Sequence, residues 1–149
     1  MRPTYCRSGL LPAATWDIRE AVHLATFEHS STALADTAAD AVVVGAYTGQ
    51  NLTPAAAEID AALGGALSAH LESTGFKGGV GEVSLLATFG RLPAAALLVA
   101  GLGPQPATTD ALRRAAGAVA RRTSRFATVA IAFPAAGPPG AEDADQAVA

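Results

Sequence analysis

A glycine-rich run with a lysine at its centre, residues 75–81 (Gly-Phe-Lys-Gly-Gly-Val-Gly), has the composition of a phosphate-binding loop. A P-loop follows a strand and opens a helix with Lys-Ser/Thr, so that backbone N–H groups and the helix N-terminus face the anion. Here the order is reversed, because the run follows an expected helix and leads into an expected strand. We therefore interpret the run as a connecting loop and keep phosphate binding by Lys77 as the alternative.

A second glycine pair, Gly101 and Gly103, lies where a dinucleotide-binding fingerprint would lie, after an expected strand and before an expected helix. That fingerprint has a third glycine and an acidic residue at the end of the next strand. Both are missing here, and Pro104 and Pro106 interrupt the segment. The pair is typical of a tight strand-to-helix turn.

Basic side chains concentrate near the end of the second expected helix. Five of the ten basic residues are Arg113, Arg114, Arg121, Arg122 and Arg125. Arg114 and Arg121 share the outer helix face, a pattern that would suit nucleic acid or an acidic partner. The net charge of −3 and the aromatic content of 5% argue against nucleic acid. We interpret the face as solvated or subunit-contacting, with nucleic acid as an alternative.

The residues that could ligate a metal or act as nucleophiles do not form a recognisable site. His23, His29 and His70 are scattered, with no carboxylate at zinc-ligand spacing. The single cysteine, Cys6, excludes an internal disulfide and a cysteine-rich zinc site. Asp60 has no second carboxylate partner in the sequence, and no Ser-His-Asp or Cys-His arrangement can be assembled. The sequence therefore predicts no catalytic, cofactor-binding or metal-binding residue in this chain.

These residues are positioned by a buried strand that leads into a capped helix. Residues 41–47 form an unbroken apolar run rich in valine, typical of a strand covered on both faces. After a polar turn, Thr53 and Pro54 supply an N-cap hydroxyl and a proline at the first helical position. An apolar residue then recurs every fourth position, which predicts one amphipathic helix from Pro54 to Glu72 that ends near Gly75. Within it, Gly64 predicts the close approach of another backbone, whereas Gly65 has no explanation in the sequence.

Further strands are expected at 22–27, as a modest edge candidate, and at 83–89, 95–100 and 127–133. The strand at 83–89 is expected to be buried. The link at 90–93 is too short for a helical crossover, so the next strand should pair antiparallel with it or lie close by. A helix begins after Thr108, with an inward face formed by Leu112, Ala115, Ala116 and Val119. Right-handed crossovers are expected at 41–89 and 95–133. This order predicts an α/β fold around a mixed sheet.

At 149 residues the chain has the length of one domain. We expect an irregular N-terminal extension at 1–20, a folded domain at 21–133 and a disordered Pro/Gly/acidic tail at 134–149. No apolar run approaches the roughly 18–20 residues that a membrane-spanning helix needs. A secretory apolar segment is also missing, so a cytoplasmic location without membrane contact is expected.

Several segments follow, in order and spacing, the pattern of a known family: 41–45, 52–57, 63–67, 76–78, 81–82, 98–103 and 112–117. Together they resemble the N-terminal domain of the leucyl (cytosol) aminopeptidases over residues 21–133. The resemblance implies a macro-domain-like fold, an α/β structure with a mixed β-sheet flanked by helices. It also implies that the chain is an incomplete member of the family, with the catalytic domain missing.

In this family a larger catalytic domain holds two divalent metals, zinc or manganese, and releases N-terminal amino acids from peptides. Full-length members assemble as hexamers, in which the N-terminal domain contributes to contacts between trimers. None of the family's catalytic motifs has a counterpart here, so the resemblance transfers no functional residue. It implies a non-catalytic scaffold and oligomer-contact domain, inactive and without cofactor by itself, that meets peptides only through the missing domain.

The alternative is a stand-alone macro-domain-like module that binds ADP-ribose or a nucleotide. Such modules generally place an Asn-Ala-Ala-Asn segment and a run of glycines at the ligand loops. The corresponding segment here, Tyr47-Thr48-Gly49-Gln50-Asn51, lacks that pattern. We therefore rank this function below the aminopeptidase N-terminal domain.

Overall fold

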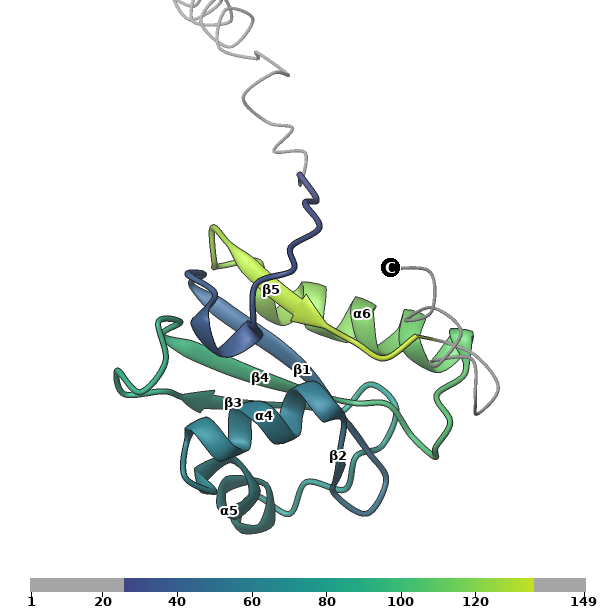
Figure 1. Ribbon diagram of the computed structural model, residues 1–149. Helices are drawn as coiled ribbons and strands as arrows, with labels where there is room; N and C mark the ends of the chain where they lie inside the picture. The colour runs from purple at the N-terminus through teal and green to yellow at the C-terminus, as the bar shows by residue number, and fades with distance from the viewer. Residues whose placement is uncertain (1–25, 136–149) are drawn as a thin grey trace, which may run out of the picture. The chain divides into compact units, whose positions relative to one another are not determined.

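The computed structural model describes residues 26–135, of which residues 32–135 fold around one mixed sheet (Figure 1). The elements in chain order are η2 (Leu34–Asp36), β1 (Ala41–Tyr47), β2 (Asn51–Leu52), α4 (Pro54–Ala62), α5 (Ala66–Ser73), β3 (Val83–Ala87), β4 (Ala96–Gly101), α6 (Thr109–Thr123) and β5 (Val129–Ala132). The predicted α/β class with a mixed sheet is confirmed. Of the predicted terminal segments, 1–20 and 136–149 lie outside the described residues.

β1 is the central strand of the sheet. It pairs in parallel with β4 on one side, where Val43 lies opposite Leu98. On its other side it pairs in parallel with β5, and its last two residues pair antiparallel with β2. β3 pairs antiparallel with β4, with Leu85 opposite Leu98. The antiparallel pairing expected from the short link at 90–93 is therefore confirmed.

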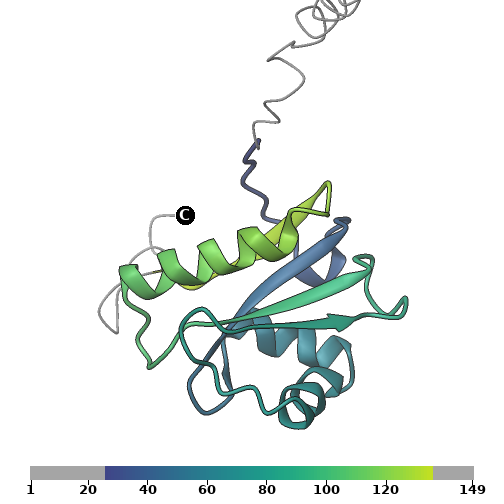
Figure 2. The ribbon, with the colours of Figure 1, turned by 180° about the vertical axis from the view of Figure 1, so that it is seen from behind.

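Helices cover both faces of the sheet. α4 and α5 lie on one face and α6 lies on the other (Figures 1 and 2). All seven residues of β1 are buried, because alternate side chains of the valine-rich run enter the two apolar clusters. Val42 and Val44 face α4 and α5, whereas Val43 faces α6.

The predicted single helix at 54–72 is instead two helices. Gly64 and Gly65 adopt positive φ angles of 67° and 84°, which glycine alone adopts readily, and these residues end α4 and begin α5. A Cβ on either glycine would meet nothing within 4 Å, so the predicted close backbone approach at Gly64 is wrong. The positive φ of Gly65 also accounts for this glycine, which has no explanation in the sequence.

Asp60 of α4 caps the second helix. Its carboxylate accepts hydrogen bonds from the backbone N–H groups of Leu67 and Ser68, at 3.0 and 3.1 Å, and from the Ser68 hydroxyl. A helix leaves its first N–H groups without partners inside the helix, so an acceptor there stabilises it. The carboxylate that had no partner in the sequence thus joins α4 to α5.

Asp60→Ala is expected to lower the free energy of unfolding by about 1–2 kcal/mol, the usual effect of removing a helix cap. Urea unfolding followed by circular dichroism measures this change. Glu58→Ala, on the exposed side of the same helix, is the matched control and should change stability by no more than about 0.5 kcal/mol. An equal loss in the two variants would contradict the capping role.

Other boundaries differ from the sequence prediction. The expected buried strand at 83–89 is a partly exposed end strand that stops at Ala87, and Leu85 is 42% exposed. β2 was not predicted, and it turns the polar segment after Tyr47 into a hairpin with β1. Thr26 and Phe27 are not in a strand, and the rest of the candidate at 22–27 lies outside the described residues.

The inward face of α6 is also shifted from the one predicted. Ala115 and Val119 are buried as expected, but Ala116 is exposed and Ala118 takes its place in the buried face. The cap is as predicted, because the Thr108 hydroxyl accepts a hydrogen bond from the N–H of Ala111 at 3.2 Å.

Candidate functional site

The glycine-rich loop packs against the carboxyl ends of β1 and β4. The carbonyl of Lys77 accepts a hydrogen bond from the N–H of Gly49 at 3.2 Å, and the carbonyl of Gly78 accepts one from Gly103 at 2.9 Å. A Cβ on Gly78 would overlap the carbonyl of Tyr47, so the backbones meet in direct contact. Ligands of open α/β sheets bind outside the carboxyl ends of the strands. In this chain the loop itself occupies part of that position.

Two N–H groups of this loop donate to Glu82. Its carboxylate accepts hydrogen bonds from the backbone N–H groups of Lys77 and Gly79, at 3.2 and 3.1 Å. A phosphate site would need such donors to face the ligand. A carboxylate of the protein already holds them here, which favours the connecting-loop interpretation over the phosphate alternative. Sequence reasoning missed Glu82, although an acid that ends a glycine run is a usable signal.

The glycine pair after β4 has a packing role. A Cβ on Gly101 would overlap the carbonyl of Gly79, and Gly103 has a φ of 77° that disfavours other residues. The N–H of Gly101 donates to the carbonyl of Glu82 at 2.7 Å, which continues the β3–β4 ladder. The pair therefore forms a tight turn under the glycine-rich loop, as predicted.

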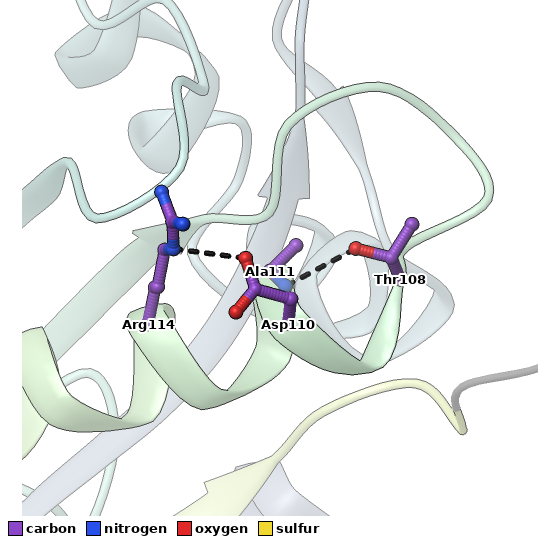
Figure 3. A network of polar contacts seen from close by, with 4 residues as sticks. All are labelled: Thr108, Asp110, Ala111 and Arg114. Carbon is purple, nitrogen blue, oxygen red and sulfur yellow. Dashed lines mark hydrogen bonds and ion pairs between the residues drawn. The ribbon is translucent and has the colours of Figure 1, made fainter.

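The predicted arginine face separates into two surfaces. At the start of α6, Arg114 forms an ion pair with Asp110 at 2.9 Å, next to the Thr108 cap (Figure 3). At its end, three arginines line an open groove of about 320 Å³ against β3 and β4. The lining residues are Val83, Leu85, Leu98, Arg121, Arg122, Ser124 and Arg125. The sequence does not indicate that these arginines lie beside β3, because this contact depends on the order of the strands in the sheet.

The histidines do not converge. The Nε2 atom of His70 lies 3.1 Å from the Ser84 hydroxyl and joins α5 to β3, while His29 is exposed. His23 and Cys6 lie outside the described residues. Within 26–135 no three His, Cys, Asp or Glu side chains gather closely enough to hold a metal ion. The donor set of this part of the chain does not fit a pair of divalent metals.

One carboxylate that the sequence did not single out clamps two strands together. Asp40, just before β1, accepts hydrogen bonds from the N–H groups of Ala127 and Thr128, at 3.0 and 2.9 Å, and from the Thr128 hydroxyl. These bonds lower the pKa of Asp40 from its ordinary value of 3.8, and the bonds with Thr128 have the largest effect. The clamp fixes the start of β5 beside β1.

Asp40→Asn is expected to reduce stability and to speed amide exchange in β5. Because the folded-state pKa is lowered, the ionised carboxylate stabilises the fold above pH 3.8, and this contribution is lost as the pH falls below that value. The difference between wild type and variant should therefore shrink from about pH 7 to about pH 3 in urea unfolding. Asp36→Asn, on η2, is the control. A difference that grows on acidification would contradict the clamp.

No helix in residues 26–135 is long and apolar enough to cross a membrane.

Comparisons with known proteins agree with one another. A family model described as "Cytosol aminopeptidase family, N-terminal domain" matches residues 43–149. The match thus continues past residue 133, where the folded domain was expected to end. A probable cytosol aminopeptidase of Acidithiobacillus ferrooxidans is 42% identical over 90 residues, which cover 60% of this chain and 18% of the relative.

Two further relatives extend the alignment. Probable cytosol aminopeptidases of Streptomyces coelicolor and Streptomyces griseus are 38% and 37% identical, covering 66% and 72% of this chain. The chain spans about a fifth of these relatives, 20% and 22% of their lengths. A mutant of tomato leucine aminopeptidase has a similar fold, with a TM-score of 0.58 and 22% identity, over 76% of this chain and 24% of that structure.

Proposed function

Since the chain belongs to the cytosol aminopeptidase family, as its N-terminal domain, we propose that it is the non-catalytic scaffold and subunit-contact part of a larger aminopeptidase. The relatives and the family model favour this function, and the matches give no support to the ADP-ribose alternative. In the proposal, peptides and two divalent metals, zinc or manganese, are bound by the four fifths of the relatives' length that this chain does not match. The name of the relatives favours a cytosolic location.

The observation that carries the proposal is the contrast between a well-packed sheet and an absent donor set. Apolar clusters fill both faces of β1 and β4, which favours a supporting domain built from residues 32–135. The same residues gather no group of three metal-ligating side chains. Chemistry by two metals needs several such ligands, so the proposal assigns it to the part of the relatives that this chain does not match.

The first test is an activity measurement on the purified chain. With leucine p-nitroanilide and added Mn²⁺, the chain alone should give no turnover above buffer. Metal-dependent turnover that co-purifies with the chain and disappears with a chelator would overturn the non-catalytic assignment.

The second test addresses the scaffold role. The N-terminal domain of the Streptomyces coelicolor relative is replaced by this chain, and the hybrid is compared with a form that lacks the domain. We expect the hybrid to form the hexamer that the resemblance implies, and the shortened form to give a smaller assembly in light scattering. Equal masses for the two forms would contradict a role in subunit contacts.

A further inference from the structure

The groove between β3 and the end of α6 combines an apolar floor with a basic rim. Val83, Leu85 and Leu98 form the floor, and Leu85 remains 42% exposed although it points toward α6. The rim carries Arg121, Arg122 and Arg125, all exposed. A surface of this kind suits a ligand that offers apolar and anionic groups side by side.

The charge of the groove is not compensated by its own lining. None of the residues that line it is acidic, so the three guanidinium groups face no carboxylate within the groove. Arg125 lies over the Phe126 ring, with 5.0 Å between the guanidinium carbon and the ring centroid, which restrains its orientation. The first part of α6 differs, because Arg114 is paired there with Asp110. The groove therefore offers an anion three guanidinium groups with no competing carboxylate in its lining.

The strand beside the groove has an edge that can accept another strand. Among the described residues, β3 is the last strand of its sheet and pairs only with β4. The backbone N–H of Gly101 donates to the carbonyl of Glu82, and the backbone N–H of Thr88 donates to the carbonyl of Ala95. In this register the even-numbered residues of β3 therefore bond to β4. In an antiparallel ladder the intervening residues then direct N–H and C=O groups to the other edge. These residues are Val83, Leu85 and Ala87, two of which also form the groove floor.

We propose that this groove binds an extended acidic peptide, which adds a strand to the free edge of β3 and places its carboxylates on the arginines of α6. Strand addition supplies main-chain hydrogen bonds, and alternate side chains of the added strand reach the same face. The ligand is thus a segment with an acidic or apolar residue at every second position. Charge disfavours the rival occupant, a second copy of this chain. Pairing of β3 with β3 would bring the arginine clusters of the two copies together, and like charges repel.

The test uses the full chain and the fluorescent peptide acetyl-Thr-Glu-Thr-Leu-Thr-Glu-Thr-amide, whose glutamates and leucine share one face. Fluorescence anisotropy should show saturable binding that weakens as NaCl is raised. Two altered peptides leave the protein unchanged. Replacing both glutamates by glutamine should weaken binding at least about tenfold, since the charge-assisted contacts are lost. Methylating the backbone nitrogens along one edge of the peptide should do the same, since strand pairing is lost.

Protein variants locate the binding. The double change Arg121→Glu and Arg125→Glu should weaken binding at least about tenfold, whereas Arg113→Glu, on the same helix outside the groove, should leave it unchanged. Circular dichroism verifies that each variant is folded. Equal binding of the glutamine peptide or of the methylated peptide overturns the proposal. Inorganic polyphosphate that competes as well as the peptide would also overturn it, because the groove would then be a general anion site. Self-association that the double change abolishes would overturn it too, because the groove would then be a contact between copies.

Discussion

Gly101→Ala is expected to destabilise the fold by about 3 kcal/mol or more, because the added methyl group meets backbone and cannot be accommodated by a rotamer change. The Cβ would overlap the carbonyl of Gly79 and lie 2.8 and 2.9 Å from the carbonyl carbons of Gly78 and Gly79. Either the loop or the end of β4 must shift. The bonds at risk are those that seal the loop, from Gly81 to Gly101 and from Gly103 to Gly78.

The matched control is on the other side of the same contact. Gly79→Ala places a Cβ at an ordinary 3.7 Å from the Glu82 carboxylate, so its effect should stay within about 0.5 kcal/mol. Urea unfolding measures both variants, and hydrogen exchange at the Gly81 and Gly103 amides reports whether the loop opens. Equal stability of the two variants would show that the loop is not held against β4.

Sequence reasoning succeeded where a local pattern and the fold require the same thing. β1 was found because an unbroken run of valine and alanine suits a strand buried on both faces, and all of it is buried. The start of α6 was found because a hydroxyl at Thr108 can cap a helix wherever that helix lies. These signals act over a few residues and do not depend on neighbouring strands.

Errors arose where the answer depends on contacts distant in sequence. Ile59, Leu63, Leu67 and Leu71 keep a four-residue period across the break at the two glycines, since both helices pack on the same cluster. The period therefore concealed the break. In β3, apolar residues occupy both faces, which suits a central strand equally well. Only the strand order places β3 at the end of the sheet.

The same reason explains what was missed in the candidate site. Asp40 meets residues more than 80 positions away, at Ala127 and Thr128, so no local pattern marks it. The basic groove joins the end of α6 to β3, and the arginines were visible in the sequence but the apolar floor was not. Sequence reasoning identified the charged residues and could not say which surface they share.

Leu97→Ala is expected to lower the free energy of unfolding by about 2–5 kcal/mol. Truncation of a fully buried leucine removes apolar contacts and leaves a cavity. Leu97 is 0% exposed in β4, in the cluster that α4 and α5 cover. In the sheet it lies opposite Val42 of β1 and Leu86 of β3, so strands on both sides limit collapse around the cavity. Urea unfolding of the purified variant measures the change.

Leu85→Ala makes the comparison decisive, because the sequence alone would expect equal losses from two leucines in two buried strands. Leu85 is 42% exposed and faces the groove, so its truncation should reduce stability by no more than about 1 kcal/mol. A ratio near one between the two losses would mean that β3 is covered in solution, and the groove at its edge would then be closed. A loss several times larger at Leu97 means that the groove face of β3 is uncovered in solution, so that it is available to the side chains of an added strand.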